Sequence, residues 1–94
     1  IDIIATDHAP HTLEEKSLPY PDSPAGMPGV ETSLPLMLTQ FKAGKCTLQQ
    51  VQNWMSIGPA EIYGIPNKGC IGEGFDADLA LVDMDRRHPV RDEE

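Results

Sequence analysis

Basic side chains and long apolar runs are both scarce in this sequence. Seven lysines and arginines stand against 15 aspartates and glutamates in 94 residues, which gives a net charge of −8. Because binding to a nucleic-acid backbone needs clustered positive charge, we expect no nucleic-acid partner. No apolar stretch approaches the roughly 20 residues that cross a bilayer, so we expect no membrane span. The acidity itself is explained by solubility.

Cysteine is also scarce. Cys46 and Cys70 lie far apart in the sequence and form no Cys-x-x-Cys pair. Disulfides are typical of oxidising compartments, where small proteins carry closely spaced cysteines. We therefore expect two reduced thiols in a cytoplasmic protein, with a disulfide as the less favoured alternative.

The most informative stretch lies near the start of the chain. Residues 1–5 are mostly apolar and predict a short buried strand. Asp7, His8 and His11 follow at once, with Pro10 between the two histidines. Since proline cannot continue a strand ladder, these polar side chains fall just past the carboxyl end of the strand. Active sites of α/β barrels are built at that end.

Residue types alone leave the role of this cluster open. Asp7 is either an acceptor for backbone N–H groups at the end of the strand or a metal ligand and base. His8 and His11 are a weak metal signal by themselves, because a zinc site needs three or four ligands.

The remainder of the chain predicts a loop, three helices and one more strand. Prolines and glycines exclude regular structure from residues 12–30, and the position of this loop suggests that it covers a substrate. Later glycines indicate tight turns and not a phosphate loop, because no Gly-Lys-Ser/Thr follows them. The predicted elements are a helix from Thr32 or Ser33 to Gly44, a second opened by Thr47 and Gln50, a third from Gly58 to Gly64, and a strand at Leu79–Val82.

Three segments of the sequence carry a family resemblance. Residues 5–11 (ATDHAPH), followed by Glu14, Glu15 and Lys16, resemble the carboxyl-terminal signature of the dihydroorotases. These are zinc-dependent cyclic amidohydrolases of pyrimidine synthesis. Residues 23–32 and 72–79 are similar to the same family, in the same order. The resemblance covers nearly the whole chain.

The resemblance implies a fold of the α/β class. A complete barrel needs about 250 residues, so the chain would be a carboxyl-terminal fragment of a metal-dependent (β/α)8 TIM barrel with the start of an accessory small β-domain. Residues 1–66 would supply the last strand, the substrate loop and the terminal helices of the barrel. Residues 67–94 would form part of the accessory β-domain.

The implied chemistry is the reversible interconversion of dihydroorotate and N-carbamoyl-L-aspartate. The family holds two zinc ions, and zinc brings the pKa of bound water to about 7. Asp7 matches both a metal ligand and the group that moves the proton from water to the departing nitrogen. The other ligands, a His-x-His pair, a carboxylated lysine and two further histidines, have no match in this chain. We therefore assign the activity to a longer parent protein and expect the fragment alone to be inactive.

The resemblance also implies how the substrate is held. His11 matches the residue that binds the substrate carboxylate, and Ala25 and Gly26 match a backbone contact to the ring. His8 has no ligand role and is interpreted as a supporting or packing histidine. Lys16 and its two acidic neighbours are interpreted as charges that order the loop or are merely solvated. A later pair, Asp76 and Asp78, is expected to serve a turn.

Two alternatives to a dihydroorotase remain. One is a related hydantoinase or allantoinase, which the presence of His11 disfavours. The other is a catalytically silent dihydroorotase-like partner of aspartate transcarbamoylase, which an intact Asp7 and His11 disfavour. A homodimer or an association with aspartate transcarbamoylase would be the expected assembly.

Overall fold

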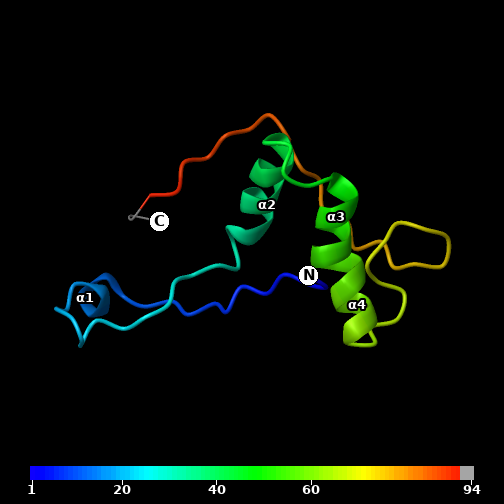
Figure 1. The fold of residues 1–94 in the computed structure, drawn as a ribbon. Helices are drawn as coiled ribbons and strands as arrows, with labels where there is room; N and C mark the ends of the chain where they lie inside the picture. Colours follow the sequence, from blue (N-terminus) through cyan, green and yellow to red (C-terminus); the bar gives the residue numbers. More distant parts are fainter. Residues whose placement is uncertain (92–94) are drawn as a thin grey trace.

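The computed structural model describes residues 1–91. Its short helices are joined by extended segments and do not form a compact domain. The Cα radius of gyration is 16.5 Å and the extents are 53 × 32 × 23 Å. A compact domain of this length would have a radius of about 12 Å. Figure 1 shows an arm that carries α1 away from the other helices. The elements are α1 (Leu13–Lys16), α2 (Ser33–Lys42), α3 (Leu48–Gln52), the π-helical turn η1 (Asn53–Ile57) and α4 (Gly58–Ile62).

Neither predicted strand forms within residues 1–91. Residues 1–5 and 79–82 run without regular structure, and Leu81 is fully exposed. A strand needs the N–H and C=O groups of a neighbouring strand, and the described part of the chain supplies none. The Ile4 amide instead donates to the carbonyl of Trp54 at 3.0 Å. The β-domain predicted over residues 67–94 therefore shows no sheet here, and its last three residues lie outside the described range.

The loop predicted over residues 12–30 contains a short helix that the sequence interpretation missed. Helix α1 begins after Thr12, whose hydroxyl accepts from the Glu15 amide at 3.2 Å while the Glu15 carboxylate accepts from the Thr12 amide at 2.8 Å. This reciprocal capping box satisfies two backbone donors at once. It allows a single helical turn in a segment that is otherwise rich in proline and glycine.

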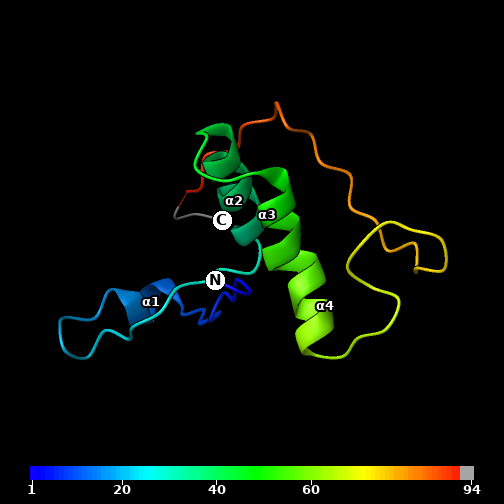
Figure 2. The ribbon, with the colours of Figure 1, turned by 45° about the vertical axis from the view of Figure 1, so that its right-hand side comes forward.

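Helices α2 and α3 form where they were predicted. Helix α2 is followed by Gly44, whose positive φ of 71° suits a residue without a Cβ. Helix α3 opens with the predicted capping box, in which the Thr47 hydroxyl accepts from the Gln50 amide at 3.1 Å and the Gln50 side chain accepts from the Thr47 amide at 2.8 Å. Figure 2 shows α2 lying beside α3.

The second and third predicted helices are one continuous helix, which corrects the sequence interpretation. Helix α3 passes through the π-helical turn η1 directly into α4. Pro59 explains the turn, because proline has no N–H to donate and its ring clashes with the carbonyl four residues earlier. The Gly58 amide accordingly donates to the Asn53 carbonyl, one residue further back than in an α-helix. The carbonyl of Trp54 is thereby left free for a partner outside the helix.

The described residues bury very little apolar surface. Val51 and Ala60 are the only buried residues among them, and Leu48 at the start of α3 is 49% exposed. The apolar face of α2 is only half-buried. None of the described helices is long and apolar enough to cross a membrane. Cys46 and Cys70 are both free thiols.

Candidate functional site

Asp7, just after the apolar run, has an uncommon backbone conformation. Its φ of 46° is in the left-handed region, which Asp and Asn occupy more readily than other residues with a side chain. The side chain is exposed. A carboxylate is therefore presented at the surface of this arm.

Two runs of backbone, residues 6–9 and 26–29, lie against each other at this site. The Ala9 amide donates to the Met27 carbonyl at 3.1 Å. A Cβ placed on Gly26, whose φ is 99°, would lie 2.6 Å from the Cβ of Ala9, and one on Gly29 would lie 3.2 Å from the Cβ of Thr6. The approach at Gly26 requires a residue without a side chain, whereas a side chain at Gly29 would need Thr6 to shift slightly. The structure thus places Asp7 and Gly26 on two neighbouring runs, with His11 shortly after the first run and Ala25 directly before the second.

His8 ties these two runs together. Its Nδ1 accepts from the Gly29 amide at 3.1 Å and from the Val30 amide at 3.3 Å. A nitrogen that accepts hydrogen bonds carries no proton, so the ring proton of the neutral side chain sits on Nε2. His8 is therefore a supporting residue, in agreement with its predicted role. Its partners, 21 and 22 residues away, could not be identified from the sequence.

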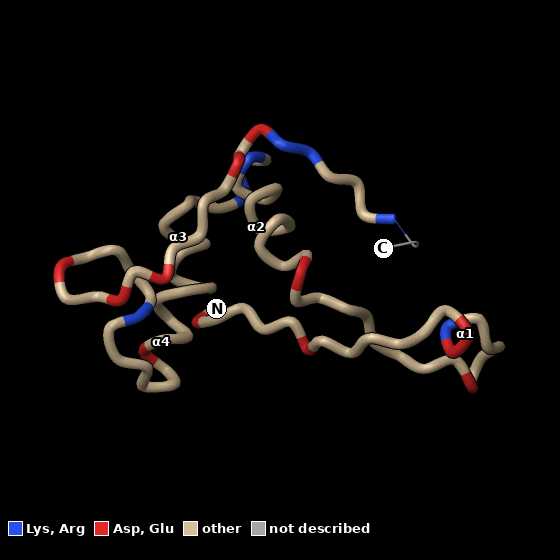
Figure 3. Tube along the Cα trace, turned by 180° about the vertical axis from the view of Figure 1, so that it is seen from behind, with Lys and Arg blue, Asp and Glu red and all other residues tan. Residues whose placement is uncertain are grey.

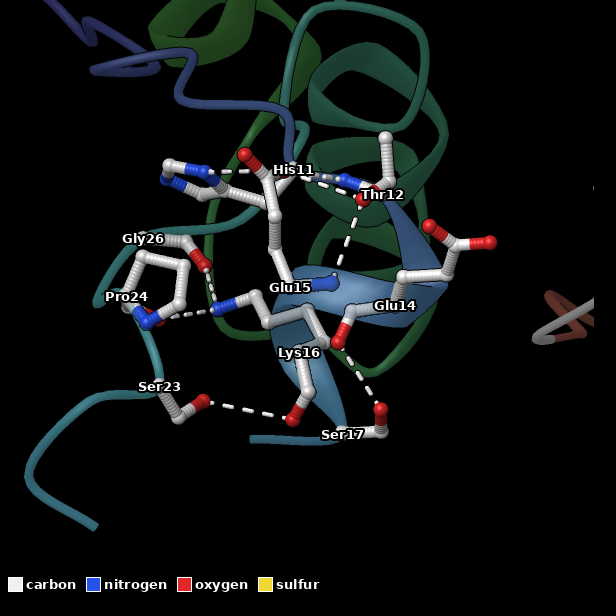
Figure 4. Close-up of polar contacts among 9 residues, drawn as sticks. All are labelled: His11, Thr12, Glu14, Glu15, Lys16, Ser17, Ser23, Pro24 and Gly26. Atoms are coloured by element: carbon white, nitrogen blue, oxygen red, sulfur yellow. Dashed lines mark hydrogen bonds and ion pairs between the residues drawn. The ribbon is translucent and has the colours of Figure 1, made fainter. Parts of the chain in front are cut away.

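Lys16 binds the part of the loop around Pro24 and Gly26. Its Nζ donates to the Pro24 carbonyl at 2.8 Å and to the Gly26 carbonyl at 2.6 Å. The Ser23 hydroxyl adds a bond to the backbone carbonyl of Lys16 at 3.2 Å. Figure 4 shows the lysine side chain reaching between the two carbonyls. Of the two predicted roles for Lys16, ordering the loop is the one that the structure supports.

Glu15 lies beside His11, while Glu14 points away from both (Figure 4). The Glu15 Oε2 is 3.7 Å from the His11 Nδ1. The hydrogen bond from the Thr12 backbone amide, then that from the Thr12 hydroxyl, lowers the pKa of Glu15 below its ordinary value, and the nearby His11 lowers it further. The anionic Glu15 can therefore hold the Nδ1 side of the imidazole, which leaves Nε2 available to a ligand.

The later acidic pair serves a turn, as expected. The Lys68 Nζ lies 3.0 Å from the Asp76 carboxylate and also pairs with Asp78. The Asp76 amide donates to the Asn67 carbonyl at 2.9 Å. These contacts fasten the loop that projects beside α4 and belong to no site near Asp7. Figure 3 shows this loop and the α1 arm on opposite sides of the molecule.

Comparison with known proteins settles the family. The amidohydrolase family matches residues 1–93. This chain is an amidohydrolase family member. Over 85 residues it is 48% identical to a dihydroorotase of Halobacterium salinarum, covering 90% of this chain and 20% of that protein. A dihydroorotase of Methanosphaera stadtmanae is 49% identical over 88% of this chain and 19% of its own length. For a dihydroorotase of Pyrococcus furiosus the identity is 46%, over 97% of this chain and 21% of that protein.

The amidohydrolase match concerns only part of each relative. The chain spans about a fifth of the length of the curated relatives that it matches. No solved structure matches it. The family membership therefore applies to this chain, whereas the activity of a complete protein is a matter of inference.

Members of this family are generally metal-dependent, and the donor set of this chain can be tested against that requirement. No group of three or more His, Cys, Asp or Glu side chains within residues 1–91 could hold a metal ion. A zinc site requires three or four ligands. Asp7 offers one exposed carboxylate, so the described residues cannot form a metal centre by themselves.

Proposed function

We propose that the protein carrying this chain is a dihydroorotase, a cytoplasmic enzyme of pyrimidine synthesis that interconverts dihydroorotate and N-carbamoyl-L-aspartate. The observation that carries the proposal is the pairing of two runs, one with Asp7 and His11 and the other with Ala25 and Gly26. In a complete protein this segment would be the last strand, substrate loop and terminal helices of a (β/α)8 barrel, followed by part of a small β-domain. The strand would form there because neighbouring barrel strands supply its missing partners.

Asp7 is the proton carrier in this proposal. Opening the ring requires water to add to the amide carbonyl and a proton to reach the departing nitrogen. A carboxylate can take the proton from the attacking water and pass it to that nitrogen, acting first as base and then as acid. The exposed position of Asp7, with a positive φ that only a few residue types adopt readily, fits a group that must meet a substrate.

His11, Ala25 and Gly26 are the substrate-binding residues in this proposal. Glu15 faces the Nδ1 of His11, so its Nε2–H can donate to the carboxylate of dihydroorotate. Ala25 and Gly26 would contact the ring through their backbone, and the close approach of Gly26 to Ala9 sets where that backbone lies. The two contacts would fix opposite parts of the substrate relative to Asp7.

Zinc is the metal that we propose for the complete site, with two ions and Asp7 as one ligand. Its remaining ligands would have to come from residues outside this chain, because the described residues do not fit a metal centre on their own. The fragment alone should consequently be inactive. Removing the metal from the complete protein with a chelator should abolish ring opening, and restoring zinc should recover it.

A related hydantoinase or allantoinase, or a silent partner of aspartate transcarbamoylase, would fit the same family. The relatives are named dihydroorotases, and both Asp7 and His11 are present in this chain, which together favour a dihydroorotase. A homodimer or an association with aspartate transcarbamoylase is compatible with each of these activities. The catalytic assignment does not depend on which assembly forms.

The test is a substrate comparison with the complete purified protein. Dihydroorotate, hydantoin and allantoin are supplied in turn with zinc, and ring opening is followed for each. Dihydroorotate should be turned over with a kcat/KM about a hundredfold above the other two, because a hydrogen bond from His11 to a charged carboxylate contributes roughly 1.5–3 kcal/mol. Turnover of hydantoin or allantoin alone, or of none of the three, would contradict the proposal.

A further inference from the structure

The segment from Pro24 to Val30 is held at both ends by side chains, Lys16 from α1 at one end and His8 from the run of residues 6–9 at the other. At one end the Lys16 Nζ donates to two carbonyls, those of Pro24 and Gly26, at 2.8 and 2.6 Å. At the other end the His8 Nδ1 accepts from two amides, those of Gly29 and Val30, at 3.1 and 3.3 Å. A cation therefore takes the carbonyls and a ring nitrogen takes the amides, which matches each side chain to the backbone groups that it can bind.

Between these two ends, one backbone bond and one close contact fix the distance of the segment. The Ala9 amide donates to the Met27 carbonyl at 3.1 Å. Gly26 approaches Ala9 so closely that a Cβ would lie 2.6 Å from the Ala9 Cβ. The two runs are thus in direct contact. Without the hydrogen bonds of His8 or those of Lys16, the segment from Pro24 to Val30 would be free to move away from residues 6–9.

No regular ladder supports this pair of runs within residues 1–91. Backbone hydrogen bonds of a sheet usually hold such a loop in register, and here only the Ala9–Met27 bond has that form. Side chains supply the remaining constraints. An ordered conformation of residues 24–30 must offset the backbone entropy that their fixation removes.

We propose that His8 and Lys16 are positioning residues that act as a two-ended backbone clamp, which places Ala25 and Gly26 opposite the Asp7–His11 run. The effect of the clamp on substrate binding rests on the proposed dihydroorotase function, since Ala25 and Gly26 are the proposed contact to the substrate ring. The clamp itself is a property of the fold. The clamp gives His8 and Lys16, which take no part in the proposed proton transfer, the same role of holding the loop.

The experiment uses four variants of the complete zinc-loaded protein. His8→Leu removes the acceptor, while His8→Asn keeps an acceptor oxygen at nearly the position of Nδ1. Lys16→Met keeps the length of the side chain and removes its donors. Lys45→Met is the matched control, because the Lys45 side chain is exposed and makes no hydrogen bond or ion pair within the described residues.

The first readout is amide hydrogen exchange, which does not depend on activity. In His8→Leu the amides of Gly29 and Val30 should exchange about tenfold faster or more, the change that accompanies loss of about 1.4 kcal/mol of local protection. His8→Asn should restore most of the protection. In Lys16→Met the Ala9 amide should exchange faster, because the segment that carries its Met27 acceptor is released at one end. Unchanged exchange at these amides in both His8→Leu and Lys16→Met would overturn the clamp.

The second readout separates positioning from chemistry. A misplaced ring contact weakens substrate and transition state alike, so KM for dihydroorotate should rise about tenfold in His8→Leu and Lys16→Met while kcat changes by less than about threefold. Lys45→Met should match the parent in both readouts. Faster exchange with unchanged KM would overturn the positioning role. If the parent protein fails to act on dihydroorotate, the proposed function fails, and the exchange data still decide whether the clamp exists.

Discussion

The carbonyl of Trp54 accepts a hydrogen bond from the amide of Ile4 at 3.0 Å, although the two residues are 50 positions apart. The indole Nε1 of the same residue donates to the Ile1 carbonyl at 3.1 Å. Trp54 thus holds the first residues through both its backbone and its side chain. The carbonyl is free for this bond because Pro59 lacks an N–H and the Gly58 amide has moved to Asn53. One proline therefore positions the run that leads to Asp7.

Pro59→Ala should weaken this attachment. Alanine supplies the missing N–H and has the highest helix propensity, so η1 should relax to an α-helix. The Gly58 amide would then bond to Trp54 and displace Ile4. Hydrogen exchange of the Ile4 amide in the complete protein should become about tenfold faster, the change that follows a loss of about 1.4 kcal/mol. Unaltered protection of Ile4 would show that Pro59 does not cause the free carbonyl.

The 94-residue chain made alone should lack a cooperative unfolding transition. Val51 and Ala60 are the only buried residues in the described part, which is too little apolar burial to offset the entropy of ordering the chain. Heating should give a gradual change in helical circular dichroism. A sharp transition from a species that sedimentation shows to be a monomer would contradict this expectation.

Thr12→Val should raise the pKa of Glu15 towards its ordinary value of 4.5. The hydrogen bonds from the Thr12 amide and hydroxyl favour the charged carboxylate, so they depress the pKa in the folded state. Because the folded pKa is the lower one, the stabilisation by this capping box is present above pH 4.5 and is lost as the pH falls through the folded pKa. A carbon NMR titration of the Glu15 carboxyl group measures the shift. Thr39→Val, in α2, is the control and should leave this titration unchanged.

His11→Ala should weaken binding of the substrate carboxylate. A hydrogen bond to a charged group contributes roughly 1.5–3 kcal/mol, which corresponds to a rise in KM of about tenfold to 150-fold. Dihydrouracil has the same ring without the carboxylate and should lose little further activity in the variant. The measurement is kcat/KM for both compounds with both enzymes. Equal losses for the two compounds would show that His11 acts on the reacting ring instead.

Short-range features of this fold could be predicted from the sequence, and long-range ones could not. The capping box of Thr47 and Gln50 lies within four residues, so its outcome depends on local geometry alone. The strand predicted for residues 1–5 does not form among the described residues, because it depends on neighbours that they do not provide. The π-helical turn was missed because Pro59 was interpreted as the start of a helix, a position that proline also favours.

The candidate site shows the same division. The motif from Asp7 to His11 could be found in the sequence, since its residues are nearly consecutive. The partners of His8 could not be predicted, because they lie 21 and 22 residues further along the chain and the path of the loop between them is known only from the structure. The two carbonyls bound by Lys16 could not be predicted either, because every residue has a backbone carbonyl and the sequence does not indicate which ones a lysine will reach.

The most direct measurement is the kcat of Asp7→Asn for dihydroorotate in the complete zinc-loaded protein. Asparagine accepts the φ of 46° as readily as aspartate, so the backbone conformation should persist and the loss of rate should come from the lost carboxylate. General acid–base catalysis contributes about 10²- to 10⁴-fold, and kcat should fall by at least that much. Asp2→Asn, at an exposed position five residues earlier, should retain the parent rate. An Asp7→Asn rate within about tenfold of the parent would show that Asp7 is structural and that the proposed proton transfer is wrong.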